Sequence, residues 1–176
     1  MNADIPERND RAELDTAHAL PRVIARVAKI IDSDSFPTGY RAGLRRTDPR
    51  DPPSLAFYRF AFRCLPADWE RCPEAWQVII AGLAITSPGG HLPSRPMGTV
   101  LAATGFSEKR LERLLSANGQ VMRALVLRLA RFTAAKRAGF DWTDTARLVL
   151  TTNGRRREKI RLRIARHFYS NTSAKE

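Results

Sequence analysis

Apolar residues recur along this chain at the three-to-four-residue spacing of an α-helix, whereas the alternating pattern of a β-strand is scarce. In residues 120–137, six side chains fall on one helical stripe: Met122, Leu125, Val126, Leu129, Phe132 and Thr133. Residues 14–31 repeat this spacing around Pro21, a residue type that can split or kink a helix. Residues 73–86 are apolar on nearly every side, which is typical of a buried helix. The sequence therefore predicts an all-α fold.

Proline- and glycine-rich loops separate the predicted helices. Further helices are expected over residues 40–46, 54–65, 97–104, 107–117 and 154–169, and one more begins after Asp141 or Thr143 as its N-cap. The loop SPGGHLPSRP, residues 87–96, is the best candidate for a domain boundary or a mobile segment. We therefore predict two small helical bundles packed together, over residues 13–90 and 91–176, preceded by a disordered acidic segment over residues 1–12.

The charge of the chain is strongly positive and unevenly placed. Thirty Lys and Arg residues against 18 Asp and Glu give a net charge of +12, and because residues 1–20 carry −3, the remainder carries +15. A field of this size attracts polyanions, of which nucleic acid is the commonest. A basic surface that is merely solvated is the simpler alternative. Arg outnumbers Lys by 25 to 5, which suits phosphate binding but also follows from codon bias.

The residues that would carry catalysis or bind a metal are not arranged for it. The sequence has no HExxH motif, no GxxxxGK[ST] phosphate loop, and only scattered Cys and His residues. The acids needed for two-metal chemistry do not cluster. We therefore predict no catalytic residues, no metal and no cofactor. No apolar run approaches the roughly 18 residues of a membrane span, and the acidic N-terminus is unlike a signal peptide, so the expected location is the cytoplasm, without membrane contact.

The last predicted helix has one cationic face and one apolar face. Arg156, Lys159, Arg163 and Arg166 are spaced 3, 4 and 3 residues apart, which places them along one side of a helix. A second face consists of Ile160, Ile164, His167 and Phe168. A helix of this kind can lie on a bundle while its bases face a phosphate backbone, although a solvated face would show the same pattern.

The stretch ATGFSEKRLERLLSANG, residues 102–118, resembles a helix-turn-helix. A helix that reads bases needs polar groups such as Asn, Gln, Ser and Arg near its N-terminus. Here Glu108 and Glu112 would face phosphates, and neither Asn nor Gln occurs before Asn118. The pattern favours a packed helix with basic flanks, and a DNA-binding regulator that uses residues 98–117 remains the alternative.

Four segments in this order resemble CasB, the small subunit of the type I-E CRISPR Cascade complex. They are GYRAGLRR (39–46), PSLAFYRF (53–60), GTVLAATGFSEKRLERLLSA (98–117), and FDWTDTARLVL (140–150) followed by the basic helix that ends in RIARHFY. The likeness covers roughly residues 39–169. Two departures concern packing more than function: this chain reads Thr151–Thr152 where many members have a second aromatic, and it lacks the Trp that many members have near Ile164.

The resemblance implies an all-α, non-catalytic subunit present in two copies within an RNA-guided surveillance complex. It implies contacts with the backbone and large subunits of Cascade, with a second copy of this chain, with the crRNA–target DNA hybrid and with the displaced strand. Such a subunit needs charge and shape, because base pairing reads the sequence.

We predict that twelve basic residues bind the nucleic-acid backbone: Arg41, Arg45, Arg46, Arg59, Arg110, Arg113, Arg128, Arg131, Arg156, Arg157, Lys159 and Arg163. Two of them, Arg59 and Arg110, could instead be structural and bind carbonyls or acids between helices. A structural adaptor whose charge pairs with an acidic protein is a further alternative.

Overall fold

The computed structural model describes the backbone of residues 6–172 and the side chains of residues 19–170. Within that part of the chain the fold is all-α, as predicted, with nine α-helices, one 3₁₀ helix and no strand. The first half contains α1 (Pro6–Asp32), α2 (Thr38–Arg45), α3 (Leu55–Cys64), the 3₁₀ helix η1 (Ala67–Arg71) and α4 (Pro73–Thr86). The second half contains α5 (Met97–Ala103), α6 (Glu108–Ser116), α7 (Gly119–Ala135), α8 (Trp142–Leu150) and α9 (Gly154–Thr172).

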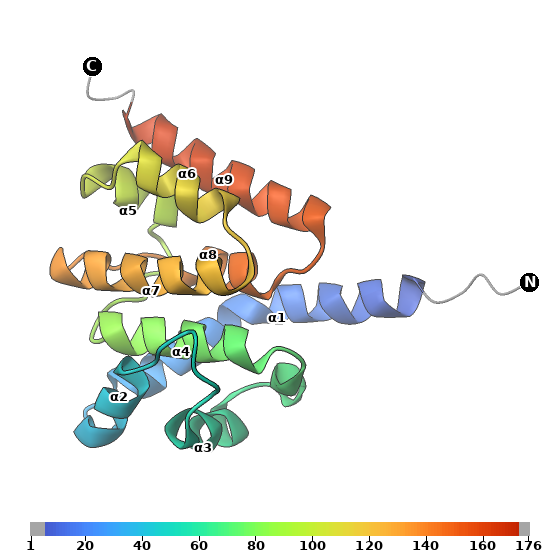
Figure 1. The fold of residues 1–176 in the computed structure, drawn as a ribbon, viewed down its shortest axis with the longest axis vertical. Helices are drawn as coiled ribbons and strands as arrows, with labels where there is room; N and C mark the ends of the chain where they lie inside the picture. The colour runs from blue at the N-terminus through green and yellow to red at the C-terminus, as the bar shows by residue number, and fades with distance from the viewer. Residues whose placement is uncertain (1–5, 173–176) are drawn as a thin grey trace, which may run out of the picture.

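The helices lie in successive layers along the long axis of the molecule (Figure 1). At one end α9 packs closely on α5, with α6 beside them, and α7 and α8 form the next layer. The buried helix α4 packs on α7 and α8 and also on α1, while α2 and α3 lie at the opposite end. One continuous set of buried apolar residues runs through these layers.

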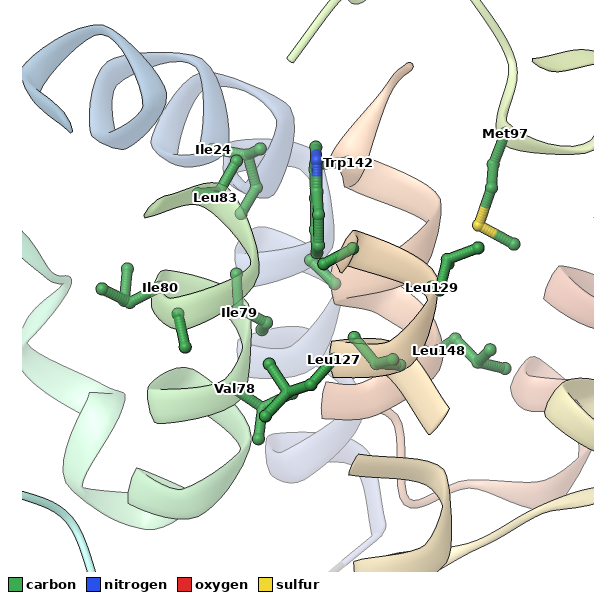
Figure 2. Packing of buried hydrophobic residues seen from close by; sticks show 14 of the residues in the cluster. Ile24, Val78, Ile79, Ile80, Leu83, Met97, Leu127, Leu129, Trp142 and Leu148 are labelled. Carbon is green, nitrogen blue, oxygen red and sulfur yellow. The ribbon is translucent and has the colours of Figure 1, made fainter. Parts of the chain in front are cut away.

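The centre of the molecule depends on close contact between α4 and α8. Trp142 at the start of α8 is fully buried and lies between α1, α4 and α8 (Figure 2). A Cβ atom at Gly82 of α4 would lie 2.2 Å from the Trp142 ring, so only glycine leaves room for the indole. Ile24 of α1 and Leu83 of α4 both lie to the same side of the ring in Figure 2. This contact therefore sets how closely α8 can approach α4.

A second close contact fixes α9 on α5. A Cβ atom at Gly98 would lie 2.2 Å from the carbonyl oxygen of Ile164, so the backbones of the two helices almost touch. The apolar face of α9 is turned inward as predicted, with Ile160, Ile164 and Phe168 all buried. Because this register is fixed, the residues on the far side of α9 are directed outward.

The predicted stripe on α7 is largely buried, and several boundaries differ from those expected. Pro21 lies inside the continuous helix α1, and the 3₁₀ helix η1 had no counterpart in the prediction. The loop over residues 87–96 is tied to the start of α8, because Leu92 N–H donates to the Phe140 carbonyl and Asp141 N–H donates to the Arg95 carbonyl.

The division into bundles at residue 90 stays a prediction. So does the disorder of residues 1–12, since α1 begins at Pro6, residues 1–5 lie outside the described chain, and no side chain is described before residue 19.

Candidate nucleic-acid interface

The twelve predicted phosphate-binding residues divide into side chains that bind the protein itself and side chains that face solvent. Arg41 and Arg45, one turn apart on α2, belong to the first group. Arg41 donates from Nε to the Ile31 carbonyl at 3.0 Å and from Nη2 to the Ser33 carbonyl at 3.0 Å, where α1 ends. Arg45 in the same way donates to carbonyls at the end of α4, with a 2.7 Å bond from its Nε to Ala84. Both side chains satisfy carbonyls that a helix end leaves unpaired.

Two more of the twelve are engaged near α9. Arg163 donates to both carboxylate oxygens of Asp144, with 3.2 Å from its Nε to Oδ2. Asp144 is buried on α8 and also accepts from Arg147. Arg157 donates to the Thr151 carbonyl and to the side chain of Asn118. These guanidinium groups hold α9 against α8 and the loops beside it.

Eight of the twelve are exposed. One of them is Arg45, which binds the end of α4, and the other seven are Arg46, Arg59, Arg110, Arg113, Arg128, Arg131 and Lys159. Arg156 is half-buried at the start of α9. Within residues 19–170 no hydrogen bond or ion pair holds the side chains of Arg59 and Arg110, the two for which a structural role was the alternative. Because α3 and α6 lie at opposite ends of the molecule (Figure 1), Arg59 and Arg110 belong to separate surfaces.

The cationic stripe of α9 contains partly different residues from those predicted. With Ile160, Ile164 and Phe168 inward, the basic residues that lie opposite and are exposed are Arg155, Lys159 and Arg166. The predicted stripe placed Arg163 among them, but Asp144 binds that residue. Arg155 could have been found by taking the centre of the apolar face as the reference and reading the bases directly across from it. We call Arg155, Lys159 and Arg166 the α9 stripe.

A second cationic face lies on α7, where Arg128 and Arg131 are exposed one turn apart. Arg131 lies near the loop that follows α2. In that loop the pKa of Asp48 falls to about 2, mainly because Arg50 donates hydrogen bonds to its carboxylate, and Arg131 adds a smaller effect through its charge. Arg131 of the α7 face is therefore close enough to Asp48 to affect its carboxylate, which is already paired with Arg50.

Helix α6, the predicted alternative reading helix, is packed through Leu111 and Leu114, both buried. Ser107 at its N-cap position is exposed and makes no capping hydrogen bond. Glu108 is exposed at the N-terminal end, where a reading helix would meet DNA, and Glu112 is exposed one turn further along. This arrangement places negative charge where base readout needs neutral or positive groups.

Among residues 19–170, whose side chains the structure describes, no cluster of three or more His, Cys, Asp or Glu residues is suited to a metal ion. Cys64 and Cys72 are free thiols, and burial raises the pKa of each. No described helix is long and apolar enough to cross a membrane.

The fold and this surface define a class of protein, an all-helical chain that exposes arginines and lysines on several helix faces. The comparison with protein families makes the assignment specific. The chain belongs to the CRISPR-associated protein Cse2 family, whose model matches residues 40–169. Cse2, or CasB, is the small subunit of the type I-E Cascade complex, so the resemblance seen in the sequence is confirmed. A search of curated proteins gave no match.

Proposed function

We propose that this Cascade small subunit binds nucleic-acid backbone through its exposed basic faces and thereby stabilises the R-loop. The observation that carries the proposal is that the α9 stripe and the α7 face present guanidinium and ammonium groups at exposed positions. Arg41, Arg45, Arg157 and Arg163 are not part of the proposed contact surface, because their guanidinium groups already bind the protein.

The mechanism follows from the energetics of strand exchange. An RNA–DNA hybrid is about as stable as the DNA duplex that it replaces, so small contributions decide whether the R-loop persists. A cationic surface that holds the displaced strand slows its re-annealing, and it needs no recognition of bases. The partners proposed are the backbone and large subunits, a second copy of this chain, crRNA and target DNA. The chain has no catalytic role in this proposal and acts in the cytoplasm in antiviral defence.

The proposal is tested with the reconstituted complex carrying Arg155→Ala, Lys159→Ala and Arg166→Ala together. We expect normal assembly and weaker retention of target DNA. The slope of log affinity against log salt should become shallower by about 2, since each lost contact to a single strand contributes about 0.7. A matched control is the triple variant Arg22→Ala, Lys29→Ala and Arg71→Ala, which removes three exposed bases from elements outside these faces.

A different outcome would favour a rival function. If the free chain binds a palindromic duplex as a dimer, with strong sequence preference, the helix-turn-helix regulator becomes the better explanation. If neither the free chain nor the complex loses nucleic-acid affinity in the α9 triple variant, the proposed site on α9 is wrong. A complete lack of affinity for nucleic acid at moderate salt would favour the adaptor that pairs with an acidic protein.

A further inference from the structure

An apolar groove with an acidic rim lies between α6 and α9. Its volume is about 370 Å³, and its lining includes Leu115, Leu162 and Ala165. Leu162 is 57% exposed and Tyr169 is 49% exposed, which makes them two of the few large apolar side chains that face solvent among the described residues. Glu108 and Glu112 of α6 and Glu158 of α9 line the same groove.

Most of the acidic side chains that the structure describes in the second half of the molecule line this groove. Residues 101–170 contain five acids. Asp141 accepts a hydrogen bond from Thr143 N–H as the N-cap of α8, and Asp144 binds Arg163. The other three acids, Glu108, Glu112 and Glu158, line the groove. Arg161 balances part of this charge, with 3.7 Å between its Nη1 and Glu158 Oε2.

Each of the two helices separates its charges by face. On α6 the positions of Glu108, Glu112 and Leu115 lie together, while Lys109 and Arg113 lie about a third of a turn away. On α9 the groove side includes Glu158 and Leu162, and the α9 stripe lies beside it. A phosphate backbone that follows the stripe would be repelled by the groove, so a polyanion is an unsuitable occupant.

We propose that this groove is a docking site for an amphipathic helix of another protein, with an apolar ridge flanked by Arg or Lys. The three carboxylates select the basic flanks, and Leu162, Leu115 and Tyr169 accept the ridge. The groove residues of α9 extend from Glu158 to Tyr169, a length of about 16 Å, which fits roughly three turns of a helix. A helix is favoured over an extended peptide, because α6 and α9 offer no strand edge to pair with its backbone.

The test uses the free full-length chain and two synthetic peptides of roughly three helical turns. Both peptides carry the same leucine ridge, and the flanks are Arg and Lys in one and Glu in the other. We expect the cationic peptide to bind although the protein itself carries +12. Neutralising Glu112→Gln and Glu158→Gln should weaken that binding about tenfold at low salt, since each exposed pair contributes modestly. A photo-crosslinking residue at position 162 should capture the cationic peptide.

A matched control neutralises two bases on the outer faces of α6, Lys109→Gln and Arg113→Gln, and should not weaken the cationic peptide. Circular dichroism and the melting temperature confirm that both variants fold. The proposal fails if the anionic peptide binds at position 162 as well as the cationic one, or if the Glu variants bind normally. It also fails if the free chain forms a dimer that Glu112→Lys abolishes, because a second copy would then fill the groove. No nucleic acid is present, so this outcome is independent of the function proposed above.

Discussion

The arginines of α2 and the bases of α9 have similar chemistry and nearly the same spacing, but the former bind other parts of the protein and the latter face solvent. Arg41 and Arg45 on α2 bind carbonyls at the ends of α1 and α4. Arg155 and Lys159 on α9 are also four residues apart, and they face solvent. The difference lies in what surrounds the helix: α2 is short and lies where two longer helices end, whereas α9 lies at the edge of the molecule (Figure 1). Spacing alone does not separate a binding surface from a brace.

The contact that orients the α9 stripe gives the largest expected effect. Gly98→Ala places a methyl group 2.2 Å from the Ile164 carbonyl, and we expect a loss of about 3 kcal/mol in the free energy of unfolding, as in other overpacked sites. Urea denaturation measures it. Gly39→Ala on α2 is the control, because no atom lies within 4 Å of the position that its methyl group would take, and it should stabilise by about 0.5 kcal/mol. Equal effects at the two glycines would show that α9 is not fixed by this contact.

The ion pair between α8 and α9 should have the next largest effect. Asp144→Asn removes the charge that binds Arg163 and Arg147, and we expect a loss of about 2 kcal/mol, since hydrogen bonds to charged groups are the stronger ones. A double-mutant cycle with Arg163→Ala measures the coupling. Glu158→Gln is the control, because Glu158 is mostly exposed and its loss should change stability by less than about 0.5 kcal/mol. Additive effects of Asp144→Asn and Arg163→Ala would contradict a structural role for Arg163.

Two substitutions, Arg41→Ala and Arg59→Ala, distinguish an arginine that stabilises the fold from one that binds nucleic acid. Arg41→Ala should reduce stability by about 1 kcal/mol, because two carbonyls at the end of α1 lose their donor. It should leave the salt dependence of DNA retention unchanged. Arg59 lies at an exposed position of α3. Arg59→Ala should therefore leave stability unchanged and make the salt dependence of DNA retention shallower. If Arg41→Ala weakens DNA retention while the melting temperature is unchanged, Arg41 returns to the predicted binding set.

The smallest expected effect is a pH dependence at His91. The Nδ1 of His91 accepts a hydrogen bond from the backbone N–H of Trp142 at 3.2 Å. Burial lowers the pKa of His91, and the charges of Asp141 and Asp32 oppose this shift. A lowered pKa means that the folded protein holds the neutral imidazole, so stability present above about pH 6.5 is lost as the pH falls below it. The melting temperature should fall slightly between about pH 7.5 and 5.5. His91→Asn should flatten that change, and an unchanged slope would assign the effect to other groups.

Much of the fold follows from local sequence pattern. The bounds of α4, residues 73–86, agree with the prediction, because its apolar run ends at a proline on one side and at Ser87–Pro88 on the other. The inward face of α9 follows from the spacing of Ile160, Ile164 and Phe168. Asp141 is the N-cap of α8, one of the two residues proposed.

The candidate site could be predicted only in part, because the partners of several arginines are distant in sequence. The carbonyls bound by Arg45 lie 39 and 42 residues away, and no pattern within α2 indicates which helix ends there. Arg163 meets Asp144 across 19 residues. The acidic groove has the same origin, since Glu112 and Glu158 meet only after α6 and α9 have packed. Charge and helical period reveal that a basic surface exists, and long-range packing decides which bases remain on it.

The close approach of α5 and α9 at Gly98 has a consequence for how such a surface can change over generations. The backbone of α9 packs directly on α5. The outward residues of the α9 stripe are therefore not needed for that packing. They can be exchanged one at a time with little penalty in folding. The number and spacing of charges on α9 can therefore change, and with them the nucleic-acid path that we propose, whereas position 98 has almost no freedom to vary. The fold therefore constrains position 98, at the contact between α5 and α9, and leaves the outward residues of α9 free to vary.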